Sequence, residues 1–197
     1  MEKLYQLVSL TLIVILLGNC APKRKIQRIE TDQTVDLSGR WNDSDSRAVS
    51  ENMTGQLLHA SWINEYQKQN QGERPVLIVG LVKNKSHEHI DANTFIKDIE
   101  RAIIQDGSAR LVQAGNKRED LRNERVDQQT FASGETAKDW GLELGADFML
   151  QGTINSIVDT YKKEKIVYYQ INLELSNLET NEVVWIGEKK IKKYISN

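Results

Sequence analysis

The only cysteine of the chain, Cys20, is the residue whose position points most directly to chemistry. It follows an apolar run of about 11 residues, Leu7 to Leu17, that begins soon after Lys3. A run of this length is typical of an export signal, whereas a transmembrane helix needs ~20 residues. A thiol at the end of such a signal predicts that the mature chain begins at Cys20 and carries lipid there.

The residues before Cys20 resemble the lipobox of bacterial lipoproteins. Leu17 and Gly18 fit that motif, whereas Asn19 departs from it because Gly, Ala or Ser is usual at that position. Lipidation with two or three acyl chains would anchor the chain stably, at ~0.8 kcal/mol for each buried CH₂ group. Two alternatives stay open: an ordinary cleaved signal with an incidental cysteine, and an uncleaved signal anchor.

The most metal-like cluster is His87-Glu88-His89. On an extended segment the two imidazoles would point to one side, but a zinc site needs further ligands, and the spacing is not His-Glu-x-x-His. We therefore predict a solvated loop and no metal. His59 lies near an apolar helix face and is predicted to be a partly buried packing residue.

Acidic residues gather at Asp36, Asp43 and Asp45, just before a helical pattern. Helix capping and a favourable interaction with the helix dipole explain them better than a cation site. The segment 134–138 has a single glycine and does not form a phosphate-binding loop. No nucleophile or paired carboxylate is placed for catalysis, so we predict no enzyme and no cofactor.

Two other residue types are candidates for surface recognition. Lysines crowd the last predicted strand, where they protect a sheet edge from aggregation or contact an anionic glycan or lipid surface. Most of the tryptophans are predicted core anchors, with Trp41 and Trp62 the better candidates for an interface hot spot. The residues concerned are Lys189, Lys190, Lys192, Lys193, Trp41, Trp62, Trp140 and Trp185.

The composition excludes several classes of protein. The formal net charge is −2 with 27% charged residues, so nothing indicates an electrostatic nucleic-acid binder. One cysteine also excludes a disulfide within the chain. We predict a signal peptide over 1–19, a lipidated tether over 20–39 and a single globular domain over 40–197. The tether would reach at most about 65–70 Å at ~3.3–3.6 Å per residue.

Hydrophobic periodicity predicts the order of the elements. The order is that of an α/β (α+β) domain with a mixed sheet of about four to five strands flanked by helices. Its closing turn is Glu179-Thr180-Asn181, because Asn tolerates positive φ. We predict a helix over 44–67 capped by Asp43 or Ser44, a helix over 91–106 with Asp91 as its cap and Gly107 as its end, and a helix over 133–145. We also predict a solvated helix or mobile insert over 117–128, and strands over 75–82, 110–114, 148–158, 167–175 and 183–195.

Several segments together resemble the LpoB family, outer-membrane lipoproteins that activate class A penicillin-binding proteins. Their order and spacing carry the resemblance, which covers the chain from about Asp36 to its end. The closing turn has Asn181 where the family often has Gly, and the tether is shorter than that of the best-known members. The segments are 36–47, 74–84, 89–91, 145–152, 168–169 and 178–185.

The resemblance implies a fold like the amino-terminal domain of TolB and a non-catalytic regulator of peptidoglycan synthesis. It would lie on the periplasmic side of the outer membrane and bind a class A penicillin-binding protein. From their exposure in the loop after the first strand, we expect Lys83, Asn84, Lys85 and His87 to contact the partner. The alternative is a structural or secretion-associated lipoprotein like CsgG, whose core is related. The oligomeric state stays open.

Overall fold

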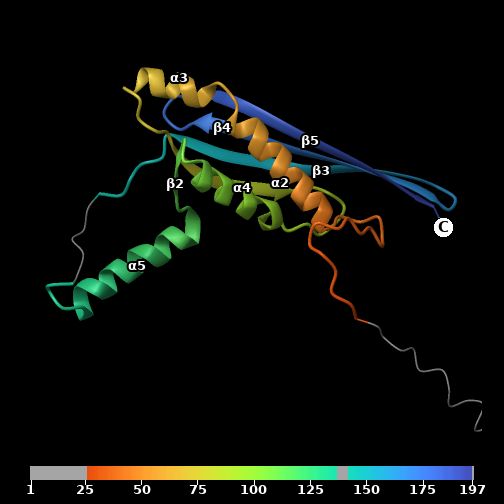
Figure 1. The fold of residues 1–197 in the computed structure, drawn as a ribbon, viewed down its shortest axis with the longest axis horizontal. Helices are drawn as coiled ribbons and strands as arrows, with labels where there is room; N and C mark the ends of the chain where they lie inside the picture. The colour runs from red at the N-terminus through yellow and green to blue at the C-terminus, as the bar shows by residue number, and fades with distance from the viewer. Residues whose placement is uncertain (1–25, 137–141, 197) are drawn as a thin grey trace, which may run out of the picture. The chain divides into compact units, whose positions relative to one another are not determined.

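The computed structural model describes residues 26–136 and 142–196. The chain divides into two units, Met1–Gln33 and Thr34–Asn197. In the first unit, residues 26–33 are exposed and contain one turn. The second unit holds every described helix and strand (Figure 1). No helix in the described ranges is both long and apolar enough to cross a bilayer. Cys20 lies outside the described residues.

The second unit is built on one mixed sheet of five strands, in the order β2-β1-β3-β4-β5. β1 pairs in parallel with β2 and β3, and the long strands β3, β4 and β5 form an antiparallel meander. This confirms the predicted mixed α+β sheet. The strands are β1 (Val76–Asn84), β2 (Arg110–Val112), β3 (Phe148–Tyr161), β4 (Glu164–Asn177) and β5 (Val183–Ser196).

Strict alternation of apolar and polar residues determines which face of β4 is buried. Val167, Tyr169, Ile171, Leu173 and Leu175 are all fully buried. Their neighbours in sequence point to the opposite face, since successive side chains of a strand alternate. The predicted strand over 167–175 is therefore confirmed.

Helices cover the buried face of the sheet (Figure 1). α2 (Asp43–Leu58) packs against α4 (Asn93–Asp106) and β5, and α4 also contacts β2. On α4, Phe95, Ile99 and Ile103 are fully buried, which is the stripe expected of an amphipathic helix. Gly107, with φ of 75°, ends this helix in the left-handed conformation, as predicted. The predicted cap, Asp91, lies one residue before the observed cap, Ala92.

The predicted helix over 44–67 is wrong in two respects. It is divided into α2 and α3 (Trp62–Gln69), because the chain turns at residues 59–61. The turn lets the Trp62 indole donate to the Leu57 carbonyl (2.8 Å) while its ring packs on Phe148. The cap of α2 is Asn42, where Asp43 or Ser44 was expected. His59 ends α2 and is exposed, so the predicted packing role is also wrong.

One extra residue interrupts the regular pairing of β1 with β3. Val79 pairs with Leu150 and Val82 pairs with Gly152, so three steps along β1 match two along β3. This is a β-bulge. Val82 is buried, whereas Leu81 is 68% exposed.

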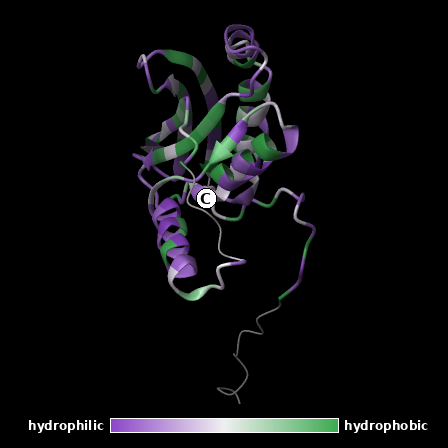
Figure 2. Cartoon of the chain, turned by 90° about the vertical axis from the view of Figure 1, so that its left-hand side faces the viewer, coloured by the Kyte–Doolittle hydropathy of each residue, from purple (hydrophilic) through white to green (hydrophobic). Residues whose placement is uncertain are grey.

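The segment between β2 and β3 differs most from prediction. α5 (Gly115–Phe131) has no buried residue and is coloured mainly as hydrophilic in Figure 2, which confirms the solvated helix. The predicted helix over 133–145 is wrong where it is described: residues 142–146 are coil, with Leu142 and Leu144 exposed. Arg122 and Arg125 of α5 bind Glu143 there, and the hydrogen bond from Arg122 lowers the pKa of Glu143 to about 2. Ala137 and Trp140 lie outside the described residues.

Candidate partner-docking site

The site begins where β1 ends. The predicted strand ended at residue 82, but β1 continues to Asn84. The Asn84 amide donates to the carbonyls of Glu88 (2.7 Å) and Ile90 (3.3 Å), and its oxygen accepts from the Ser86 backbone N–H (2.9 Å). This asparagine therefore folds the loop over residues 85–90 into a fixed shape.

His87 and Glu88 attach the loop to the sheet. The His87 backbone N–H donates to Ser156 Oγ (3.0 Å), and His87 Nδ1 lies 2.7 Å from the same oxygen. The imidazole stacks on the Tyr169 ring at 6.0 Å, and its Nε2 lies 3.2 Å from the Glu88 carboxylate. These contacts restrict His87 to one orientation although the residue is exposed at the surface.

Lys83 and Lys85 are the free charges of this site. Both are exposed, and neither takes part in any ion pair among the described residues. The Lys85 backbone N–H donates to the Ile154 carbonyl (2.8 Å), and no side-chain hydrogen bond of Lys85 is formed with residues 26–136 or 142–196. The structure therefore brings all four predicted residues together, with two side chains fixed and two lysines free.

The chain entering α2 closes over the same end of the sheet. The Trp41 backbone N–H donates to the Glu88 carboxylate (2.9 Å). The Trp41 ring meets Tyr169 edge-on at 5.4 Å and Phe95 at 6.4 Å. Its indole N–H donates to Ser46 Oγ (2.9 Å). Trp41 thus links the entering chain, the loop and the sheet.

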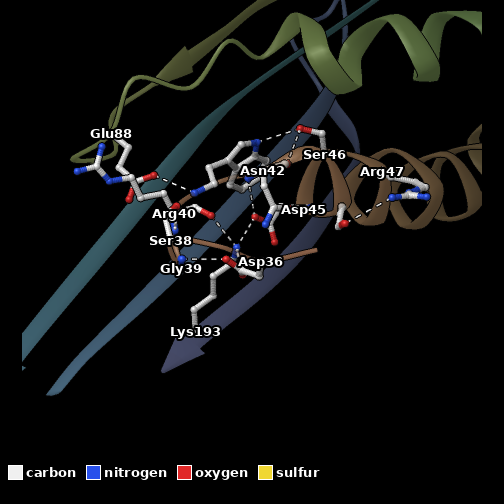
Figure 3. Close-up of polar contacts among 12 residues, drawn as sticks. Asp36, Ser38, Gly39, Arg40, Asn42, Asp45, Ser46, Arg47, Glu88 and Lys193 are labelled. Atoms are coloured by element: carbon white, nitrogen blue, oxygen red, sulfur yellow. Dashed lines mark hydrogen bonds and ion pairs between the residues drawn. The ribbon is translucent and has the colours of Figure 1, made fainter. Parts of the chain in front are cut away.

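Lys193 of β5 fixes the same segment from the other side. Its Nζ lies 2.7 Å from both the Asp36 and the Asp45 carboxylates, and donates to the Arg40 carbonyl at 2.8 Å (Figure 3). The Lys193 side chain is only 10% exposed. Burial lowers the pKa of Lys193, but the two carboxylates outweigh burial and leave that pKa raised. Lys193 is therefore not the edge-protecting lysine that was predicted.

A capping box completes this network. The Asn42 side chain accepts from the Asp45 backbone N–H (3.2 Å), and the Asp45 carboxylate accepts from the Asn42 backbone N–H (2.9 Å). Two of the free N–H groups at the start of α2 are satisfied in this way. Asp45 is thus a capping residue, as predicted, and binds Lys193 as well.

Tyr169 lies at the centre of these contacts. It is fully buried, and its hydroxyl is the buried side-chain oxygen without a hydrogen-bond partner among the described residues. Burial raises the pKa of the Tyr169 phenol, and the nearby Glu88 carboxylate raises it further. The phenol is neutral at physiological pH.

Sequence reasoning missed Glu88 and Tyr169 as parts of this site. Only the position of Tyr169 in an alternating strand was a signal, and it indicated burial alone. Trp62, a predicted hot-spot candidate, is 2% exposed and belongs to the core. No group of three or more potential metal ligands occurs within residues 26–136 and 142–196.

Comparison with known proteins identifies the family. The model of the peptidoglycan-synthase activator LpoB matches residues 45–191, which is most of the chain. A search of curated proteins finds no significant match. The matching model is not that of CsgG, so the secretion-associated alternative is not supported.

Solved structures that are similar include the following three. The LpoB C-terminal domain from Salmonella enterica is 16% identical, with 72% of this chain and 96% of that chain covered and a TM-score of 0.38. LpoB from Escherichia coli is 13% identical, with 90% and 81% covered and a TM-score of 0.38. Lipoprotein GNA1162 from Neisseria meningitidis is 14% identical, with 62% and 84% covered and a TM-score of 0.35. On the strength of the family model over residues 45–191, this chain belongs to the LpoB family of peptidoglycan-synthase activators.

Proposed function

We propose that this protein is a non-catalytic lipoprotein that binds and activates a class A penicillin-binding protein from the periplasmic side of the outer membrane. Family membership over residues 45–191 is the observation that supports the proposal. The anchor would be lipid on Cys20, and the tether would occupy residues 20–39, as the sequence predicts. Regulation of peptidoglycan synthesis would then follow from binding alone.

Activation without catalysis requires a difference in affinity. A regulator shifts its partner toward the active conformation only if it binds that conformation more tightly than the idle one. A tether to the membrane raises the effective concentration of the domain beside its partner. The fixed geometry of residues 84–90 suits such a role, because a rigid surface loses little conformational entropy on binding.

The surface proposed for docking is formed by Lys83, Lys85 and His87, with Asn84 as the residue that holds the loop in shape. The two free lysines supply positive charge, so the partner surface would be acidic. Reversing both charges (Lys83→Glu with Lys85→Glu) is expected to weaken binding to the synthase by about tenfold or more. Binding would be measured with the full-length chain and purified synthase by biolayer interferometry at low and high salt.

A matched control uses Lys163→Glu, which reverses an exposed lysine in the turn between β3 and β4. This variant should bind like the wild type. Equal affinity of the double variant and the wild type would exclude Lys83 and Lys85 from the docking surface. A synthase whose activity is unchanged by the bound chain would exclude the activator role.

The anchor has its own test. Mass spectrometry of the chain isolated from membranes is expected to show a mature amino terminus at Cys20 carrying acyl chains. The Cys20→Ser variant should leave the membrane fraction and retain the family fold. A Cys20 found with a free thiol would contradict the anchoring proposal.

A further inference from the structure

A second surface lies at the other end of the sheet. A cavity of about 680 Å³ opens between α3, the start of β3 and the turn that joins β4 to β5. This volume is in the usual range for ligand sites, about 300–1,000 Å³. Lys83, Asn84, Lys85 and His87 do not line this cavity, whereas Trp62, the other hot-spot candidate besides Trp41, does.

The charges around the cavity have one sign. Four carboxylates line it, those of Glu65, Asp147, Glu179 and Glu182, and no lysine, arginine or histidine is among its described lining residues. Asp147 is used by the fold, because its Oδ2 accepts from the Val76 backbone N–H (2.7 Å). The other three are exposed and take part in no ion pair among residues 26–136 and 142–196.

Elsewhere the surface carboxylates are often paired with a base. Glu100 binds Lys97, Asp98 binds Arg101, and Glu188 binds Lys190. Like charges held around one concave site repel each other, and the wall of low dielectric strengthens their common field. A cationic ligand would relieve that repulsion, whereas an anion would add to it.

Aromatic rings give the cavity a second property. Trp62 and Tyr66 of α3 each meet the Phe148 ring edge-on, at 5.4 and 5.6 Å. These rings line the cavity together with Val183 and Val184 of β5. Burial and the neighbouring Asp147 carboxylate raise the pKa of Tyr66 to about 12, so its hydroxyl stays protonated at neutral pH. Planar guanidinium groups favour a combination of aromatic surface and carboxylates more than compact ammonium groups do.

The cavity also lies far from the end of the tether. Lys193 of β5 binds Asp36, where the entering chain joins the domain, and Val183 of the same strand lines the cavity. Ten residues of strand separate Lys193 from Val183, which corresponds to about 33 Å at ~3.3 Å per residue. If the chain is anchored as proposed, this end is available to a partner approaching from the periplasm; this step alone rests on the proposed function.

We propose that the cavity between α3 and the β4–β5 turn binds an arginine side chain from an extended basic segment of a partner protein. Glu65, Glu179 and Glu182 would bind the guanidinium, and the exposed part of the Tyr66 ring would stack on it. The apolar wall at Val183 and Val184 would contact the methylene stem.

The test uses acetyl-Gly-Arg-Gly-amide as the probe and the full-length, ¹⁵N-labelled chain in neutral detergent. Titration is expected to shift the Trp62 indole signal and the amides of residues 179–184, with a Kd on the order of 1 mM. The same peptide with citrulline, which is nearly isosteric and uncharged, should bind at least about tenfold more weakly. Glu179→Gln with Glu182→Gln should weaken arginine binding by a similar factor, since both substitutions remove charge from exposed side chains.

The matched control changes two acids of the other hairpin, Asp159→Asn with Glu164→Gln, and should leave peptide binding unchanged. Equal binding of the arginine and citrulline peptides would overturn the proposal, as would shifts confined to residues 83–89 or no saturable shift at all. Binding of the peptide without binding of the synthase would overturn the proposed function and support the cavity. Binding of the synthase without binding of the peptide would support the proposed function and overturn the cavity proposal.

Discussion

The two ends of the sheet differ in whether their charged groups are paired with opposite charges of the same chain. Where the chain enters α2, Lys193 is surrounded by Asp36, Asp45 and the Arg40 carbonyl, so each buried charge has a partner within the chain. At the β4–β5 turn, Glu179 and Glu182 line a cavity without any neighbouring base among its described residues. Charges that are satisfied internally fix the structure, whereas charges left without partners are available for recognition.

The free charges of the two ends also differ in sign. Lys83 and Lys85 are exposed beside the paired network, and the carboxylates are exposed at the cavity. Complementary charge at an interface contributes more to orientation and association rate than to affinity. A domain with opposite free charges at its ends can therefore bind a partner in one orientation and reject the reverse.

The largest expected effect tests whether the aromatic contacts of α3, at the cavity end of the sheet, stabilise the domain. Trp62→Ala removes a ring that is 2% exposed and packed on Phe148, together with the hydrogen bond to the Leu57 carbonyl. We expect a loss of about 3–5 kcal/mol in the free energy of unfolding, measured with urea. Phe131→Ala removes a ring that is 83% exposed and should change this free energy by less than about 0.5 kcal/mol. Similar values for both variants would show that α3 is not fixed by its aromatic contacts.

The next effect tests the paired network at the opposite end. Lys193→Met keeps the length of the side chain but leaves two carboxylates without their cation. We expect a loss of about 2–3 kcal/mol in the free energy of unfolding by urea denaturation. Lys192→Met, at the exposed neighbouring position, should change it by less than about 0.5 kcal/mol. If the two variants are equally stable, the network does not hold the entering chain.

A smaller effect compares the helix starts at the two ends. Asn42→Ala removes the side-chain acceptor of the capping box and should destabilise the domain by about 1 kcal/mol. Ser61 precedes α3 but makes no side-chain capping hydrogen bond, so Ser61→Ala should be nearly neutral. Thermal unfolding followed by circular dichroism would separate the two, and a larger effect at Ser61 would contradict the assigned caps.

The smallest effect concerns acid pH. The hydrogen bond from Lys193 lowers the pKa of Asp36 below its ordinary 3.8, despite burial. A lowered folded-state pKa contributes stability that is present above pH 3.8 and is lost as the pH falls through the lowered value. As the pH is lowered from neutral to below 3.8, the free energy of unfolding should therefore fall less for Lys193→Met than for the wild type. Urea unfolding in a pH series would measure this difference. Parallel pH profiles for the two proteins would show that Asp36 and Lys193 are not coupled.

Patterns within single elements were enough to predict most of the sheet. The alternation at Val167 to Leu175 identified β4, and Asn181, with φ of 62°, forms the turn expected of it. Contacts between distant segments could not be predicted in this way. The break between α2 and α3 depends on Trp62 reaching Phe148, which lies 86 positions later in the chain (148 − 62). Periodicity carries no information about such a contact.

Because periodicity carries no information about contacts between distant segments, the contacts that shape the docking site could not be predicted either. Exposure of Lys83 and Lys85 follows from polar residues after an apolar strand. The roles of Glu88, Tyr169 and Lys193 arise only when four separate segments meet. From the sequence alone, a lysine on a strand is interpreted as an edge residue. Its pairing with a carboxylate of the amino-terminal segment is apparent only in the folded structure.

The extra residue in β1 determines what the docking site presents. Because of it, Val82 and Asn84 lie on the helix-covered face beside Gly152 and Ile154, and Lys83 lies on the opposite face. Without the bulge, the same sequence would pair Leu81 with Gly152 and Lys83 with Ile154, so the lysine would enter the core and the asparagine that shapes the loop would lie on the opposite face. Deleting Leu81 would instead restore regular pairing and keep Lys83 outward. One extra residue in β1 thus places Asn84, which shapes the loop, and Lys83, which carries the free charge, on opposite faces of the sheet.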